Sequence, residues 1–390
     1  MRLAEKAVRI AVLGAGPGGA TAALALARGG ADVTVHLPAG RTEKPCGGAL
    51  PAYLLDGLSE PALAAAPSVE VEKAILENAA GGRLEVPLEG LRVYRRRELD
   101  AGLLAAAVSA GARLRQGKVR RIELADRITL CGADGVSRRY DWLVAADGAL
   151  SPTRRRLGLE PAAASVGLGA SVALAADAGP AGLVLGFPDV GDAYLWIFPR
   201  PGGVSVGIAY SAERLSDGAA GACLDGFLGD HLATAVRASR YRYPIPVFGQ
   251  RTLPDLRRAV ARRVLLVGDA AGLADPLTRE GIRPAMRAGQ WAAESLLAGR
   301  PLDYPRRLAD GLAADMTRSE HACRLFYDDR IGQWMVPVCR AVPGVRRVLG
   351  DLLSCRQPYR GLRRRLLGAV FSRRTGSRRA PAPAASGSSS

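Results

Sequence analysis

The sequence predicts a mixed α/β (α+β) protein with a Rossmann-like dinucleotide-binding domain, an inserted, mainly antiparallel β-sheet domain and C-terminal helices. Three observations lead to this prediction. Residues 8–30 suggest a buried strand, a glycine turn and a helix. Residues 161–252 form short alternating segments punctuated by Gly and Pro, and residues 264–298 return to the order of the N-terminus. These patterns are typical of a nucleotide-binding fold that carries an inserted sheet.

The first strand leads into a glycine turn, Gly14-x-Gly16-x-x-Gly19. One glycine of such a turn permits the tight backbone, one lets the chain approach a pyrophosphate, and one packs the helix on the strand. The helix N-terminus then meets the phosphate charge. A second strand completes a βαβ unit, so we predict a dinucleotide site. Its first residues are Gly14, Ala15, Gly16, Pro17, Gly18 and Gly19.

The second strand ends without the acidic residue that binds the adenosine ribose about 20 residues after the glycines. His36 and Leu37 occupy this place. A lost charge-assisted hydrogen bond costs roughly 1.5–3 kcal/mol, or about ten- to a hundredfold in affinity. Either neutral His36 replaces part of this bond, because an imidazole both donates and accepts, or it is an edge-strand residue without ligand contact.

Composition excludes several other classes of protein. The six cysteines form no Cys-x-x-Cys pair and there are only three histidines, so we expect neither a metal site nor a disulfide scaffold, and a reducing compartment fits. The uncharged run 10–27 is interrupted by glycines, which argues against a signal peptide or membrane span and predicts a cytoplasmic protein. The net charge of +17 comes with no recognised nucleic-acid module, so no nucleic acid is expected as a partner.

Six motifs occur in an order known from one flavoprotein superfamily: GAGPGG, KPCGGAL, Arg96 ahead of ELD, ADGALSPTRR, YLWIFPRPGGVSVG and GDAAGLADPLTREGI. The chain resembles the para-hydroxybenzoate hydroxylase-like superfamily over residues 8–298. Within that superfamily it resembles the geranylgeranyl reductase family, chiefly through KPCGG and the Tyr194-x-Trp196-x-Phe198 stretch.

The resemblance implies FAD as the cofactor, with NADPH, NADH or another donor reducing it. The reduced flavin then delivers hydride to a double bond of an isoprenoid or related hydrophobic substrate. The chain has no second glycine-turn unit, so a nicotinamide donor would bind transiently against the flavin. Besides the glycine turn and His36, the expected cofactor-binding residues are Cys46, Gly47, Gly48, Ala49, Arg96, Val119, Asp147, Gly148, Gly268, Asp269, Pro276, Gly281 and Ile282.

Chemistry supports several of these positions. Asp269 follows a strand at the edge of a sheet, where its carboxylate can accept hydrogen bonds from ribityl hydroxyls. A helix that begins near Gly281 would direct its positive end at the flavin ring. For Asp269 and for Asp147 the alternative is a helix-cap or turn residue.

Other positions leave two readings open. Tyr194, Trp196 and Phe198 alternate and so share one face of a strand, which either lines an alkene channel as a substrate-binding wall or is ordinary sheet core. Cys46 either acts as a catalytic residue beside the flavin or fills a turn. Arg279 stands where many relatives have glycine, and it either closes over an anionic group or narrows the substrate cavity.

Two other function classes stay in consideration. One is an FAD monooxygenase that hydroxylates or epoxidises a hydrophobic or aromatic metabolite, because both chemistries use this scaffold. The other is a degenerate flavoprotein that serves as a binding module. The oligomeric state is left open.

The C-terminal region carries much of the basic charge, with fourteen arginines against three aspartates between His321 and Arg379. Apolar residues form two helical stripes there. Such helices either lie as peripheral contacts on an anionic membrane surface or pack on the protein's own body. The stripes are Val345, Val348, Leu349, Leu352 and Leu353, and Leu362, Leu366, Leu367, Val370 and Phe371.

The expected domain organisation is discontinuous. The predicted ranges are 1–72, 92–160 and 255–320 for the FAD-binding domain, 73–91 and 161–254 for the substrate-binding sheet domain, 321–379 for the basic helical region and 380–390 for a disordered tail.

Overall fold

A five-stranded parallel sheet forms the frame of the dinucleotide-binding domain. The computed structural model describes residues 8–40, 43–56, 58, 65–162, 164–175, 178–232, 240–327 and 331–371. Strands β1, β10 and β16 are buried along nearly their whole length, as expected for the centre of a parallel sheet. The strand order is β16 (Val264–Leu266), β10 (Trp142–Ala145), β1 (Arg9–Leu13), β2 (Asp32–Leu37) and β6 (Arg113–Gln116).

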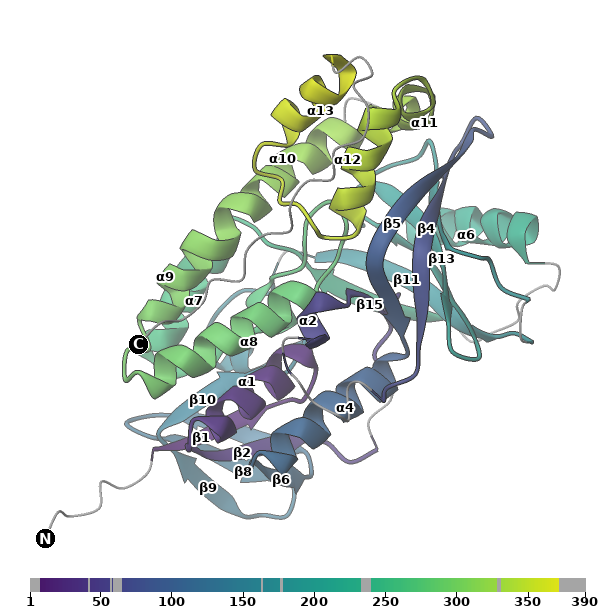
Figure 1. The fold of residues 1–390 in the computed structure, drawn as a ribbon. Coiled ribbons are helices and arrows are strands. Elements are labelled where there is room, and N and C mark those ends of the chain that lie inside the picture. The colour runs from purple at the N-terminus through teal and green to yellow at the C-terminus, as the bar shows by residue number, and fades with distance from the viewer. Residues whose placement is uncertain are drawn as a thin grey trace, which may run out of the picture.

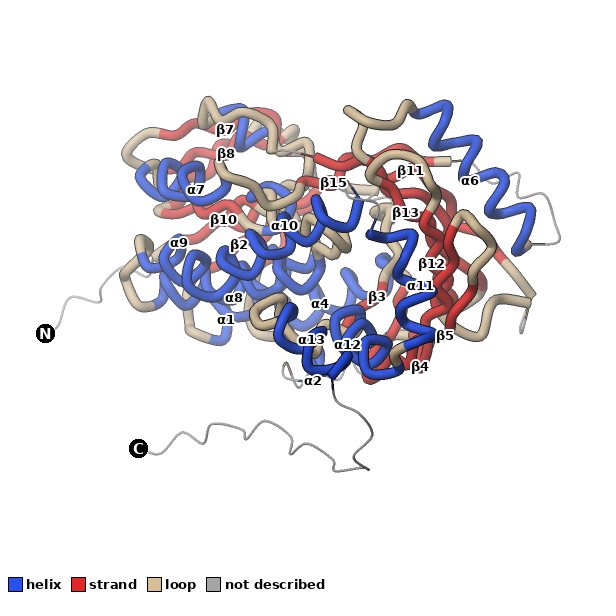
Figure 2. Tube along the Cα trace, turned by 90° about the horizontal axis from the view of Figure 1, so that it is seen from above, coloured by secondary structure: helices blue, strands red, loops and turns tan. Residues whose placement is uncertain are grey.

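Helices cover one face of this sheet, and a small antiparallel sheet covers the other (Figure 1; Figure 2). On the first face α1 (Pro17–Arg28) packs against both α4 (Arg96–Ser109) and α8 (Ile282–Leu297). Two glycines bring α1 and α8 together, since a Cβ on Gly289 would lie 2.2 Å from the carbonyl oxygen of Gly18. The opposite face carries β7 (Val119–Leu124), β8 (Ile128–Gly132), β9 (Ser137–Tyr140), α5 (Pro152–Arg156) and α7 (Thr252–Ala261).

An eight-stranded sheet forms the second domain, and all its neighbouring strands are antiparallel except β12 and β4. Helix α6 (Asp217–His231) covers one face, whereas α11 (Ile331–Ala341) and α12 (Pro343–Leu353) cover the other. The strand order is β15 (Tyr241–Pro246), β11 (Ala164–Ala173), β14 (Gly203–Tyr210), β13 (Ala193–Arg200), β12 (Leu183–Phe187), β4 (Ser68–Asn78), β5 (Arg83–Tyr94) and β3 (Ala49–Pro51).

The remaining helices connect these layers. Helices α9 and α10 run along one side of the molecule towards the C-terminal helices, with a π-helical turn between them (Figure 1). Their bounds are α2 (Tyr53–Asp56), the 3-10 turn η1 (Gly268–Ala271), α9 (Asp303–Leu308), η2 (Ala309–Ala313), α10 (Ala314–Tyr327) and α13 (Leu362–Phe371).

The second sheet takes more of the N-terminal half of the chain than the predicted segment 73–91. Strand β4 starts at Ser68, β5 ends at Tyr94, and β3 adds an edge strand at Ala49–Pro51. A strand of three residues is too short for an alternating pattern to reveal it. The predicted disordered tail, 380–390, lies outside the described residues.

Candidate functional site

A cavity of about 720 Å³ lies between the parallel sheet and the eight-stranded sheet. It opens beside the carboxyl ends of β1, β10 and β16, which is where open α/β sheets bind ligands. Most of the predicted site residues line it. These are Gly14, Ala15, Gly16, Pro17, Gly18, Gly19, His36, Cys46, Gly47, Arg96, Val119, Asp147, Gly148, Tyr194, Trp196, Phe198, Gly268, Asp269, Gly281 and Ile282.

The glycine turn leaves the N-terminus of α1 open to this cavity. Gly14 has φ +98°, and a Cβ there would lie 2.2 Å from the carbonyl oxygen of Ala146. A Cβ on Gly16 would have only the Arg96 guanidinium near it, at 4.0 Å, so this side of the turn faces the cavity. Gly16 is the N-cap of α1 and has no side chain with which to cap the helix. The first N–H groups of α1 are therefore suited to bind a pyrophosphate.

A second helix N-terminus faces the same cavity. Helix α8 begins at Ile282, with Gly281 as its N-cap, close to the predicted start. Pro284 lies in the first turn, where its missing N–H breaks no intrahelical bond. Both helices thus direct partial positive charge at one space, which favours an extended anionic ligand. In α8 part of this charge is met by the protein, because the Arg283 N–H donates to the Glu280 carboxylate at 2.6 Å.

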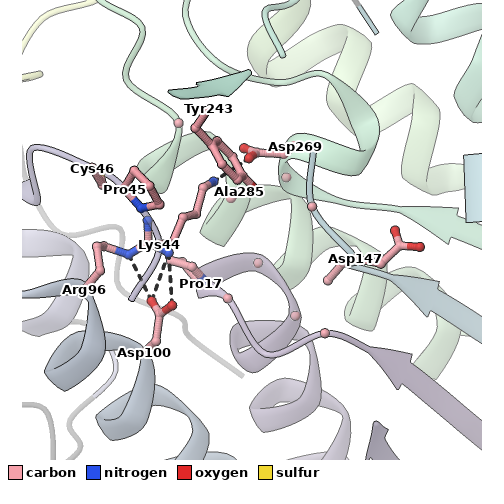
Figure 3. A pocket seen from close by; sticks show the side chains of 18 of the residues that line it. Pro17, Lys44, Pro45, Cys46, Arg96, Asp100, Asp147, Tyr243, Asp269 and Ala285 are labelled. Atoms are coloured by element: carbon pink, nitrogen blue, oxygen red, sulfur yellow. Dashed lines mark hydrogen bonds and ion pairs between the residues drawn. The ribbon is translucent and has the colours of Figure 1, made fainter. Parts of the chain in front are cut away.

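Asp269 lies at the cavity wall and forms an ion pair with Lys44 (Figure 3). Burial alone would lower the pKa of Lys44, but Asp269 raises it, so the Lys44 ammonium keeps its charge. The Lys44 ammonium also lies 5.5 Å from the centre of the Tyr243 ring. Lys44 was not predicted as a site residue, although it opens the KPCGG motif.

The Asp147 carboxylate binds residues at the start of α5. It accepts hydrogen bonds from the Ser151 hydroxyl at 2.6 Å and from the Thr153 hydroxyl and N–H at 2.6 and 3.0 Å. In Figure 3 it lies apart from the Lys44 and Asp269 group. The Asp147 side chain thus serves as a helix cap, the second of its two predicted roles. The residue lines the cavity as part of the turn between β10 and α5.

Arg96 begins α4 and is 2% exposed. Its guanidinium holds Asp100, one helical turn later, through two hydrogen bonds of 3.1 Å. Asp100 also lines the cavity and was not predicted, although an acid four residues after Arg96 on a helix is a recognisable pairing signal.

The KPCGG loop is attached to both domains. Glu43 accepts hydrogen bonds of 3.1 Å from the Arg96 N–H and from the Arg200 guanidinium. The Cys46 carbonyl accepts from the Ser205 hydroxyl at 3.1 Å, and the Cys46 sulfur accepts from the Gly48 N–H at 3.4 Å. Cys46 is a free thiol at the cavity wall, so no disulfide constrains it.

Three predicted cofactor-binding residues, Gly48, Ala49 and Pro276, lie outside the cavity lining. Gly48 has φ +85°, and a Cβ would lie 2.1 Å from the Tyr94 carbonyl oxygen, so it turns the chain into β3. Ala49 pairs with Val93 in the sheet. The Pro276 carbonyl accepts a hydrogen bond from Arg279. Their backbones serve the fold of the loops around the site.

An aromatic wall closes the side formed by the second sheet. Tyr194, Trp196 and Phe198 all line the cavity, as their alternation predicts. The Tyr194 hydroxyl donates to the Thr278 carbonyl at 2.8 Å, and Trp196 Nε1 donates to the Ser205 hydroxyl at 3.2 Å. With their polar atoms bound elsewhere, these rings offer mainly apolar surface.

Tyr241 and Tyr243 of β15 extend this wall and were missed. Their alternation in YRYPIP was the available signal, because alternating residues share a face. Burial raises the pKa of Tyr194 and of Tyr241, so both phenols are neutral and keep their protons near neutral pH.

His36 contacts Tyr140 of the small sheet. Its Nε2 lies 2.8 Å from the Tyr140 hydroxyl, and the two rings meet edge to face. Leu37, at the position of the usual acid, lines the cavity with an apolar side chain. Lys118 also lines it. This end of the cavity therefore holds no carboxylate from β2 for an adenosine ribose.

Comparisons with known proteins find reductases among the relatives of this chain. No protein-family profile matches the sequence. Digeranylgeranylglycerophospholipid reductase 1 of Methanopyrus kandleri is 30% identical over 305 residues, covering 73% of this chain and 79% of that protein. Menaquinone reductase of Mycobacterium tuberculosis H37Rv is 30% identical over 343 residues, covering 77% and 79%.

Among solved structures, a geranylgeranyl bacteriochlorophyll reductase-like protein of Thermoplasma acidophilum superposes with a TM-score of 0.72. The match covers 93% of this chain and all of that one, at 20% identity. At that identity the superposition supports the fold.

The buried His36 makes stability depend on pH. Burial, with Arg138 and Arg115 nearby, lowers the pKa of His36 to about 4 from its usual 6.5. Between these values the unfolded chain binds a proton that the folded chain does not, so acidification favours unfolding. From about pH 7.5 to about pH 5 we expect His36 to account for a loss of about 2 kcal/mol in the free energy of unfolding.

Urea unfolding of the wild type and of His36→Gln at the two pH values measures this contribution, because glutamine keeps hydrogen-bonding capacity without titrating. The exposed His321→Gln is the matched control. Equal acid sensitivity in wild type and His36→Gln would contradict the assignment.

Proposed function

We propose that this chain, which belongs to the geranylgeranyl reductase family of FAD-dependent oxidoreductases, saturates carbon–carbon double bonds of an isoprenoid or related hydrophobic substrate. One observation carries the proposal. The glycine turn, Asp269, the N-terminus of α8 and the aromatic wall all border a single cavity. A dinucleotide cofactor and an apolar chain would therefore share one space.

The residues present fit FAD. The N-terminus of α1 suits the pyrophosphate, Asp269 suits ribityl hydroxyls, and the N-terminus of α8 favours negative charge on a reduced ring. When bound and reduced, FAD supplies the hydride for the saturation. Because Leu37 stands in place of the usual acid, the contact with the adenosine ribose is missing. The charges of Asp269 and Lys44 cancel in their ion pair.

The protein's own contribution is to exclude water, hold the alkene and deliver a proton. The aromatic wall can hold an isoprenoid chain beside the cofactor, since those rings are buried apolar surface. Saturation of a double bond also needs a proton at the second carbon. We propose that this proton is delivered from the side of the cavity at which Cys46 lies. Cys46 either donates the proton or positions the group that donates it.

The electron donor is proposed as NADPH or NADH acting transiently. The described residues contain no second glycine-turn unit, so a nicotinamide would reach the flavin through the open side of this cavity. The relatives named for geranylgeranyl lipids and for menaquinone suggest a substrate with a polyprenyl chain.

Anaerobic reduction of the FAD-loaded protein tests the function. We expect the reduced flavin to be reoxidised by a polyprenyl substrate and the product to gain two hydrogens. A panel of polyprenyl and aromatic compounds, followed by flavin absorbance and product mass, measures this. A product that gains one oxygen in air would instead establish a monooxygenase, and failure to bind FAD would leave only a binding module.

Cys46 variants test the proton step. We expect Cys46→Ala to lower turnover by about a hundredfold, the lower end for loss of a general acid, with FAD occupancy unchanged. Cys46→Ser should recover part of the rate, because a hydroxyl can also donate a proton. Rates are measured on FAD-saturated protein. Wild-type turnover in Cys46→Ala would show that Cys46 only fills the turn.

The C-terminal helices are proposed as a peripheral membrane contact. In α12, Val345 is buried and Leu349 and Leu353 pack on the eight-stranded sheet, so that stripe belongs to the protein core. Helix α13 is different, because Leu367 and Phe371 are 57% and 77% exposed beside exposed arginines. Trp334 of α11, at the same end of the molecule, is 61% exposed (Figure 1). No helix among the described residues is long and apolar enough to cross a bilayer.

Sedimentation with vesicles tests this surface. We expect the full-length protein to bind vesicles containing phosphatidylglycerol at low salt, and Leu367→Ser/Phe371→Ser to bind about tenfold or more weakly, from the lost apolar burial. Leu150→Ser, at another exposed leucine, is the matched control. Equal binding of all three proteins would exclude α13 as the contact.

A further inference from the structure

Arg279 is a buried charged residue at the cavity wall for which the proposed function gives no role. It lies between η1 and α8 with φ +57°, in the left-handed region. That conformation costs a non-glycine residue stability, and glycine adopts it freely. Its side chain is nevertheless 2% exposed and lines the cavity. A residue kept there despite an unfavourable backbone conformation calls for a role.

The guanidinium is already bound by the protein. Its Nε donates to the Ser165 hydroxyl at 3.0 Å, and its Nη2 donates to the Asp192 carboxylate at 2.5 Å. Its Nη1 donates to the carbonyls of Pro276 and Leu277. Every nitrogen of the fork is engaged, so Arg279 is not arranged to hold a diphosphate or other anion in a bidentate manner.

The side chain instead separates the cavity from α10. Behind it lies Cys323, whose sulfur is 3.7 Å from Nη1 and which is 8% exposed. The Tyr327 ring of the same helix lies 5.6 Å from the guanidinium carbon. On the cavity side, the adjacent Thr278 carbonyl receives the Tyr194 hydroxyl. Arg279 therefore stands between the aromatic wall and the interior face of α10.

We propose that Arg279 closes the cavity at its α10 end and limits how far an isoprenoid chain can enter, so that it determines chain-length specificity. This rests on the proposed function for the identity of the ligand, but the closure itself does not. Asp192 holds the closing side chain in place through the buried ion pair. Removing Arg279 would extend the cavity towards Cys323 and Tyr327.

The test uses the full-length double variant Arg279→Gly/Asp192→Asn. Glycine accepts the left-handed backbone, and asparagine avoids leaving a buried carboxylate without its cation. Arg154→Met/Asp255→Asn is the matched control, because this arginine–aspartate pair is also buried and neither residue lines the cavity. Thermal unfolding of all three proteins accounts for general loss of stability.

The first readout is access to Cys323, measured by N-ethylmaleimide labelling and peptide mass. In the wild type we expect labelling only through local opening, and in the double variant labelling faster by at least about tenfold, equivalent to about 1.4 kcal/mol. Burial raises the pKa of the Cys323 thiol, and Arg279 lowers it more than Asp192 raises it, so the loss of both charges would by itself slow the reaction. A faster reaction therefore reports access. Unchanged labelling, or an equal gain in the control variant, overturns the proposal.

The second readout is binding of geraniol, farnesol and geranylgeraniol, followed by the change in tryptophan fluorescence, to which Trp196 at the cavity wall contributes. We expect the double variant to gain about tenfold for the longest alcohol, the effect of burying about two more methylene groups, and nothing for the shortest. If the wild type and the double variant rank the three alcohols by affinity in the same way, the specificity role is overturned. It is also overturned if the wild type binds pyrophosphate and Arg279→Gly abolishes that binding. If neither protein binds any alcohol while Cys323 becomes reactive, the proposed substrate class fails and the closure stands.

Discussion

The close approach of α1 and α8 is the constraint on which the site depends. A Cβ on Gly18 would lie 2.9 Å from the Ala285 carbonyl oxygen, and one on Gly289 would lie 2.2 Å from the Gly18 carbonyl oxygen. Only glycine permits this contact, and the contact fixes the separation between the two helix N-termini that face the cavity. Both termini have glycine N-caps. The N–H groups of α1 are thereby left for a ligand, whereas in α8 the Arg283 N–H donates to the Glu280 carboxylate at 2.6 Å.

The KPCGG loop performs the complementary task of joining the two sheets around that space. Glu43 connects it to α4 and to Arg200 in β13, Lys44 connects it to η1, and the Cys46 carbonyl connects it to β14. Gly47 approaches the Phe198 ring so closely that a Cβ would lie 2.5 Å from it. Gly47 was expected to contact the cofactor, but in the structure it allows the Phe198 ring of the aromatic wall to approach the backbone closely. The adjacent Cys46 is held by its hydrogen bonds with Ser205 and Gly48.

Two of the buried ion pairs lie at the cavity, and such pairs are expensive to break. Arg96 with Asp100 and Arg279 with Asp192 each place an arginine next to a carboxylate at the wall. Removing one member of such a pair costs about 3–5 kcal/mol, because the other is left charged without a partner. These pairs keep the wall rigid while offering few free donors, which suits an apolar substrate beside an anionic cofactor.

The sequence alone determined the architecture, the cofactor class and most of the cavity wall, because these depend on local signals such as the glycine turn, the strand ending at Asp269 and the alternation of Tyr194, Trp196 and Phe198. Tertiary structure decided what each polar group does. Lys44 reaches Asp269 across 225 residues, and Arg279 meets Asp192 across 87. Such partners are chosen by three-dimensional packing, and sequence spacing carries no trace of them. The engagement of Arg279 therefore emerged only from the fold, and the fold decided between the two readings of Asp147.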